Sequence, residues 1–77
     1  MKNIIIYTKH NCMPCQFTKS FLNDHEIDFI EKNIEEDESA LEEVKSLGFQ
    51  AVPVVSIEGH PPFQGFNPDR LTQLIEQ

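Results

Sequence analysis

"NIIIYTKHNCMPCQFTKSFL", residues 3–22, joins a β-like pattern to a helical pattern across a short polar loop. Its first part, residues 3–7, is a run of β-branched side chains that ends on a tyrosine, which is typical of a buried strand. In its last part the apolar side chains recur at helical spacing, at Phe17, Phe21 and Leu22. Pro14 suits the first turn of that helix, because the N–H that proline lacks would have no partner there. We therefore predict a strand over residues 3–7 and a helix that begins at Cys12 or Met13.

The middle of the chain predicts two more strands and another helix. Residues 28–34 alternate in polarity, which indicates a second strand. Asp37 is a good N-cap for a helix that ends at Gly48, because glycine favours the position just after a helix. The apolar residues of this helix recur near the helical period, at Leu41, Val44 and Leu47. Residues 53–57 are again β-branched and predict a third strand.

The C-terminal part predicts a short hairpin and a final helix. Residues 63–66 fit a brief edge strand or loop, and Asn67 is the expected N-cap of a helix with a buried stripe at Leu71, Leu74 and Ile75. The order β-α-β-α-β-β-α makes the first two strands parallel, since a helix joins them, and the last two antiparallel, since a tight turn joins them. We expect one α/β domain over residues 1–77, with a four-stranded mixed sheet and helices on both faces.

Charge and hydropathy exclude several classes of partner. The chain carries 13 acids and 6 bases, a formal net charge of -7, which disfavours binding to the phosphates of nucleic acid. The apolar run at residues 4–7 is too short for a signal-peptide core or a membrane span. We therefore expect a cytoplasmic protein that binds neither nucleic acid nor membrane.

Cys12 and Cys15 are the two cysteines of the chain, and they are open to three uses. As a staple they would close a ring of only four residues, which constrains the unfolded chain very little. As a zinc site they lack the second pair of ligands that such sites use, so we expect no metal. A thiol at a helix N-terminus, by contrast, is stabilised as the thiolate. This position favours Cys12 as a nucleophile toward disulfides and Cys15 as the thiol that resolves the mixed disulfide.

Two further segments extend this interpretation. "GFQAVPVV", residues 48–55, and "FQGFNPDRL", residues 63–71, together with the CxxC, resemble the glutaredoxin-like redoxins of the thioredoxin superfamily, most closely the NrdH-redoxin group. The resemblance implies a thioredoxin fold, with Pro53 beside the CxxC after a cis Val52–Pro53 bond. It also implies that the backbone of Val52 pairs with the extended chain of a substrate.

The resemblance further implies a dithiol–disulfide oxidoreductase with particular partners. Members of the group are reduced by thioredoxin reductase and supply electrons to class Ib ribonucleotide reductase. Such a protein needs no bound cofactor, because NADPH acts through the reductase, and we expect a monomer. The alternatives are a glutathione-dependent glutaredoxin and a metal-binding or cluster-binding module.

The chain departs from the family at positions that bear on the choice of partner. Phe63 replaces the usual tryptophan of the NrdH-redoxin box, and Asn67 replaces its arginine. Phe66 occupies the place of the second glycine of ordinary glutaredoxins, where a large side chain should crowd glutathione. Lys9, which glutaredoxins use for glutathione, is retained. We expect an apolar partner-binding surface around the CxxC, formed by Met13, Val52, Phe63 and Phe66.

Overall fold

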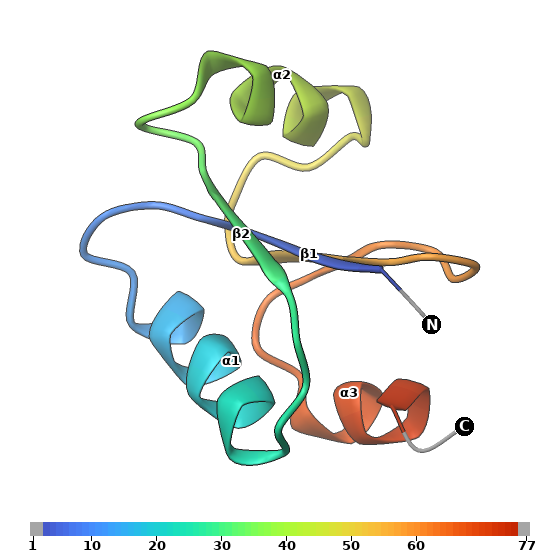
Figure 1. Ribbon diagram of the computed structural model, residues 1–77. Coiled ribbons are helices and arrows are strands. Elements are labelled where there is room, and N and C mark those ends of the chain that lie inside the picture. Colours follow the sequence, from blue (N-terminus) through green and yellow to red (C-terminus); the bar gives the residue numbers. More distant parts are fainter. Residues whose placement is uncertain (1–2, 76–77) are drawn as a thin grey trace.

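The computed structural model describes the backbone of residues 3–75 and the side chains of residues 3–73, so the predicted burial of Leu74 and Ile75 lies outside the described side chains. The elements follow in the predicted order, β-α-β-α-β-β-α (Figure 1). They are β1 (Ile4–Thr8), α1 (Met13–Asp24), β2 (Ile30–Asn33), α2 (Glu38–Ser46), β3 (Val54–Ile57), β4 (Phe63–Gln64) and α3 (Pro68–Ile75).

The strands form one mixed sheet in the order β2-β1-β3-β4. β1 and β2 are parallel, and Thr8 pairs with Asn33 where both strands end. β3 runs antiparallel to β1 and to β4, and Val54 pairs with both Tyr7 and Gln64. The predicted sheet and its strand directions are therefore confirmed.

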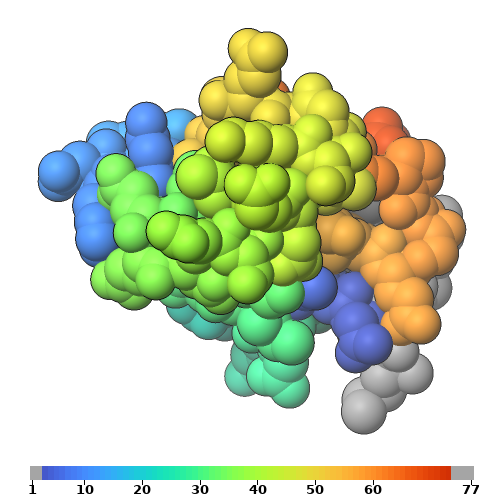
Figure 2. Space-filling view, turned by 90° about the horizontal axis from the view of Figure 1, so that it is seen from above, coloured from blue at the N-terminus to red at the C-terminus, as the bar shows by residue number. Residues whose placement is uncertain are grey.

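The helices cover both faces of the sheet, as predicted: α2 lies on one face, and α1 and α3 lie on the other (Figure 1). Viewed from the α2 side, the residues of α2 and its flanking loops cover the centre of the molecule (Figure 2). No helix within residues 3–75 has the length and apolar character needed to cross a membrane.

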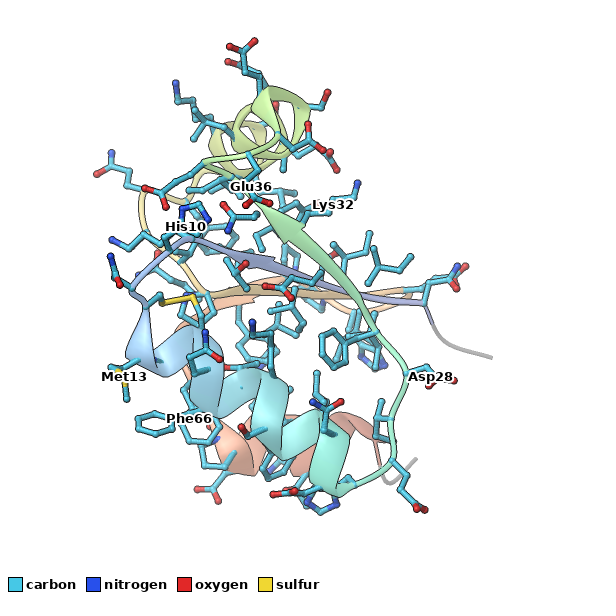
Figure 3. The ribbon with its side chains drawn as sticks, turned by 60° about the vertical axis from the view of Figure 1, so that its left-hand side comes forward. His10, Met13, Asp28, Lys32, Glu36 and Phe66 are labelled. Carbon is cyan, nitrogen blue, oxygen red and sulfur yellow. A yellow bond between two sulfur atoms is a disulfide. The ribbon has the colours of Figure 1, made fainter. Side chains whose placement is uncertain are left out.

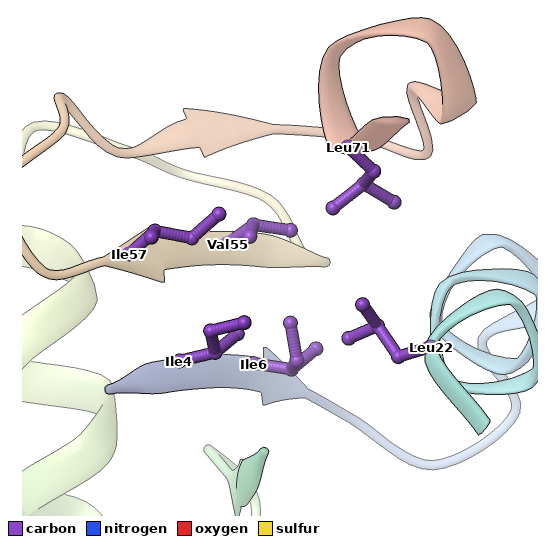
Figure 4. Packing of buried hydrophobic residues seen from close by; sticks show 6 residues of the cluster. All are labelled: Ile4, Ile6, Leu22, Val55, Ile57 and Leu71. Atoms are coloured by element: carbon purple, nitrogen blue, oxygen red, sulfur yellow. The ribbon is translucent and has the colours of Figure 1, made fainter. Parts of the chain in front are cut away.

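Two apolar clusters hold these layers together. The larger cluster joins β1 and β3 to α1 and α3 through Ile4, Ile6, Leu22, Val55, Ile57 and Leu71 (Figure 4). The smaller cluster joins the other face of the sheet to α2 through Tyr7, Ala40, Val44 and Val54. Alternate residues of β1 enter opposite clusters, as the period of a strand requires.

The helix ends follow the local signals in the sequence. The Asp37 carboxylate accepts a hydrogen bond from the backbone N–H of Ser39 at 2.9 Å. The side-chain oxygen of Asn67 accepts one from the backbone N–H of Arg70 at 3.1 Å. Gly48 follows α2 with a φ of +89°, a left-handed conformation that favours glycine. Both predicted N-caps and the predicted C-terminal glycine are confirmed.

The predicted apolar stripes differ from the observed ones at two positions. Leu47 belongs to the predicted apolar stripe of α2, but it lies 43% exposed after the helix has ended, whereas Ala40 is fully buried. Phe17 lies on the predicted apolar face of α1, yet it is 50% exposed. Helical spacing identifies the apolar face of a helix. It does not show which part of that face a neighbouring element covers.

Candidate active site

Cys12 and Cys15 are joined by a disulfide at the start of α1, with their Cα atoms 5.2 Å apart. Cys12 is itself the N-cap of this helix, and its Sγ accepts a hydrogen bond of 3.2 Å from the backbone N–H of Cys15. An N–H donor and the positive end of the helix dipole both stabilise negative charge on this sulfur. The predicted placement of Cys12 at a helix N-terminus is confirmed. The structure also shows that the Cys12 sulfur is itself the N-cap, which the sequence did not predict.

The loop before β3 lies against the same sulfur. The Val52–Pro53 peptide bond is cis, as the family resemblance implied, and Pro53 is fully buried. The carbonyl oxygen of Val52 lies 3.9 Å from Sγ of Cys12. The carbonyl of Pro53 is already occupied by the N–H of Gly65, at 2.8 Å. Segments far apart in the chain therefore meet at the disulfide.

An apolar surface lies on one side of the disulfide. Met13 is 62% exposed and Phe66 is 37% exposed, and both lie below the yellow S–S bond in the view of Figure 3. The ring of Phe17 lies 5.9 Å from that of Phe66, centroid to centroid, which extends the surface along α1. We call Met13, Phe17 and Phe66 the apolar rim. Sequence reasoning missed Phe17, although its place one turn after Met13 on α1 could have indicated it.

The two other aromatic and aliphatic residues expected at this surface lie deeper. Phe63 is half-buried and packs against the larger apolar cluster, while the Arg70 guanidinium lies over its ring at 5.1 Å. Val52 is half-buried and packs against the smaller cluster. The side chains of Phe63 and Val52 therefore pack into the core beneath the site and do not belong to the apolar rim.

A polar hollow of about 400 Å³ lies on the α1–β2 side of the active-site loop. Lys9 lines it, together with His10, Asn11, Gln16, Lys19, Glu31, Asn33 and Glu36. His10 does not turn toward the sulfur: its ring nitrogens lie 3.0 Å from Glu35 and 3.0 Å from Glu36. Lys9 therefore lies in a hollow that contains both basic and acidic side chains.

Beneath this hollow, Thr8 links the sheet to a charged pair. Its buried hydroxyl donates to Glu31 at 2.8 Å, and Lys19 donates to the same carboxylate oxygen at 3.0 Å. Partial burial raises the pKa of Glu31, but the hydrogen bonds from Lys19 and Thr8 outweigh burial and hold it below its ordinary value. The predicted strand over residues 3–7 ends before Thr8, and nothing in the local sequence shows that Glu31 faces it.

No group of three or more His, Cys, Asp or Glu side chains within the described part of the chain is arranged to hold a metal ion. The chemistry available at the site is that of the two sulfurs. A CxxC disulfide at a helix N-terminus, beside a cis-proline loop on this mixed sheet, defines a thiol–disulfide oxidoreductase with the thioredoxin fold.

Comparisons with known proteins define the group more closely. The glutaredoxin family model matches residues 4–61, and the chain belongs to this family as one of its NrdH-like members. It is 41% identical to the glutaredoxin-like protein NrdH of Lactococcus lactis, over 92% of this chain and 97% of the relative. The solved structure of NrdH-redoxin from Escherichia coli superposes with a TM-score of 0.85 at 33% identity, over 94% of this chain and 93% of that one.

Proposed function

We propose that the protein passes electrons from thioredoxin reductase to a protein disulfide, with Cys12 as the nucleophile and Cys15 as the resolving thiol. The observation that carries this proposal is the position of Cys12, whose sulfur caps α1 beside the exposed apolar rim. The acceptor we propose is class Ib ribonucleotide reductase, the partner implied by the NrdH resemblance. The protein would act as a cytoplasmic monomer without a bound cofactor.

The reaction transfers two electrons in two exchange steps. In the reduced protein, the Cys12 thiolate attacks one sulfur of the substrate disulfide, and the other substrate sulfur leaves as a thiolate that takes up a proton. The Cys15 thiol then loses its proton and attacks Sγ of Cys12. This step forms the Cys12–Cys15 disulfide and releases the second substrate sulfur, which is protonated to complete the dithiol.

Binding of the substrate chain would use the backbone of Val52. The Pro53 carbonyl is occupied by Gly65, whereas the Val52 carbonyl points toward the Cys12 sulfur at 3.9 Å. An extended segment pairing here would place its cystine next to that sulfur. The apolar rim would then receive the side chains that flank the cystine.

The preference for thioredoxin reductase over glutathione rests on Phe66 and on charge. Phe66 occupies the position where ordinary glutaredoxins use a glycine to contact glutathione, and its ring packs against that of Phe17. A net charge of -7 also disfavours an anionic tripeptide. The similar NrdH-redoxin of Escherichia coli has a thioredoxin-like activity profile.

Trapping of the mixed disulfide tests the assignment of the two cysteines. We expect Cys15→Ser to accumulate a covalent adduct with a disulfide substrate, because the first attack remains and the release step is lost. Cys12→Ser should form no such adduct, and mass spectrometry of both variants measures this. A stable adduct through Cys15 in the Cys12→Ser protein, with none in the other variant, would reverse the roles.

Coupled assays test the electron donor. The oxidised protein is supplied with NADPH and thioredoxin reductase in one cuvette, and with glutathione, NADPH and glutathione reductase in another. We expect fast NADPH oxidation only in the first. Fast turnover only in the second would make the protein a glutathione-dependent glutaredoxin, the alternative that the retained Lys9 would favour.

A further inference from the structure

His10, the residue two positions before Cys12, is held between two carboxylates. Its Nδ1 lies 3.0 Å from Glu35 Oε1, and its Nε2 lies 3.0 Å from Glu36 Oε2. Its backbone N–H also donates to Glu35 Oε1, at 2.6 Å. Figure 3 shows His10 beside Glu36, on the opposite side of the disulfide from Met13 and Phe66.

The carboxylates that hold His10 belong to a loop that is itself fixed. The Asn33 side chain accepts a hydrogen bond from the backbone N–H of Glu35 at 2.8 Å, and the Asn33 carbonyl accepts from Glu36 and Asp37. Asn33 is the last residue of β2 and pairs with Thr8 at the end of β1. Hydrogen bonds therefore hold the backbone of the loop after β2, whose exposed Glu35 and Glu36 side chains contact the loop that leads into Cys12.

Only Asn11 separates His10 from Cys12 in the chain. Asn11 adopts a φ of +56°, a left-handed conformation that asparagine enters more readily than most residues, and Cys12 follows at once as the cap of α1. Contacts that hold His10 therefore also position the chain on which the Cys12 sulfur is carried.

The protonation state of the imidazole decides whether both contacts can be made. A neutral imidazole has one N–H donor and one acceptor nitrogen, so one of the two carboxylates would face a lone pair. The imidazolium ion donates through both nitrogens and carries the opposite charge. We infer that His10 is a proton-dependent positioning residue, which ties the Cys12 loop to Glu35 and Glu36 when protonated and releases it as the pH rises.

Several other charged groups surround His10. They are Lys9 of its own loop, Lys19 of α1 and Glu31 of β2, besides Glu35 and Glu36. Lys19 and Glu31 are paired with each other at 3.0 Å. Carboxylic acids and lysine amines ordinarily titrate outside the range between about pH 5 and 8 in which imidazole changes charge. In the oxidised protein the two sulfurs are in the disulfide and do not titrate.

The test follows the His10 amide hydrogen in the oxidised protein. Its exchange with water is measured by NMR magnetisation transfer and divided at each pH by the intrinsic rate for an unstructured chain. Both pairs are exposed, so their loss should lower protection of this amide only about two- to tenfold between about pH 5 and 8. In His10→Gln, which keeps the backbone donor and Glu35 but cannot titrate, protection should stay constant.

A pair of matched variants distinguishes the contact between His10 and Glu36 from a general effect of losing one negative charge. Glu36→Gln removes one of the two carboxylates and should reduce the pH-dependent change in protection. Glu42→Gln removes the same charge from an exposed position of α2 and should leave the change intact. Constant protection in the natural protein, an equal change in His10→Gln, or equal effects of the two glutamine variants would each overturn the inference.

Discussion

Tyr7 provides a sharp test of how α2 is fastened to the sheet. Its side chain is only 3% exposed, and its hydroxyl donates to Glu43 Oε1 at 2.8 Å. Lys32 of β2 also reaches both oxygens of this carboxylate, at 3.2 Å. Burial, with the hydrogen bond and charge of Glu43, raises the pKa of Tyr7 from 10.0 to about 12. The fold therefore favours the neutral phenol.

The shift sets a magnitude and a pH range. Each unit of pKa difference between the folded and unfolded chain corresponds to about 1.4 kcal/mol, so two units correspond to about 2.7 kcal/mol. Because the folded pKa is raised, this stabilisation is present below the unfolded pKa of about 10 and is lost as the pH rises through about 12. We expect the free energy of unfolding to fall by about 2–3 kcal/mol more in the natural protein than in Tyr7→Phe between about pH 9 and 12.

The composition makes the assay direct. The chain has 1 tyrosine and 0 tryptophans, so the near-ultraviolet absorbance of tyrosinate reports Tyr7 alone. Absorbance titration of the folded protein gives its pKa, and denaturant titrations of both proteins at several pH values give the free energies. A folded midpoint near 10, with circular dichroism unchanged, would refute the reasoning.

Three further predictions concern the core, the charged pair and the apolar rim. Leu22→Ala should lower the free energy of unfolding by about 2–5 kcal/mol, because the side chain is fully buried between α1 and β1, and a loss well below 1 kcal/mol in denaturant titrations would contradict this. Glu31→Gln should cost at most about 1 kcal/mol at neutral pH, since the pair with Lys19 is partly exposed. That difference should vanish in acid, because the lowered pKa of Glu31 means that its contribution is lost as the pH falls through its folded pKa. Phe66→Gly should raise glutathione-dependent turnover relative to reductase-dependent turnover in the two coupled assays, and an unchanged ratio would count against the proposed role of the ring.

The sequence predicted the elements of the fold because its local signals agree with one another. The second strand is shorter than the predicted 28–34, since only residues 30–33 of β2 find partners in β1. The alternation within it was nevertheless correct: Phe29 and Glu31 face the α1 side, while Lys32 reaches Glu43 of α2. A period of two fixes which face a side chain occupies, but the length of the neighbouring strand fixes where pairing stops.

The site was less predictable where it depends on side chains that meet across the fold. The contacts of His10 with Glu35 and Glu36 span some 25 residues of sequence, and no local pattern links the three residues. Phe17 lies on the predicted apolar face of its helix, but the ring beside it belongs to Phe66, which is far along the chain. The positions of the cysteines could be predicted without knowledge of long-range contacts, because the strand, the loop and the helix that place them are adjacent in the chain.

The two cysteines differ more in their surroundings than in their exposure. Cys12 is 5% exposed and Cys15 is fully buried, so exposure alone separates them only slightly. Attack on a disulfide occurs along the S–S axis, from the side opposite the leaving sulfur. Cys12 adjoins the exposed Met13, and the Val52 carbonyl lies 3.9 Å from its sulfur. Cys15 lies within α1 and has no exposed surface, so an incoming thiolate cannot reach its sulfur unless the fold opens. These surroundings support Cys12 as the residue whose sulfur exchanges with the partner in the proposed reaction.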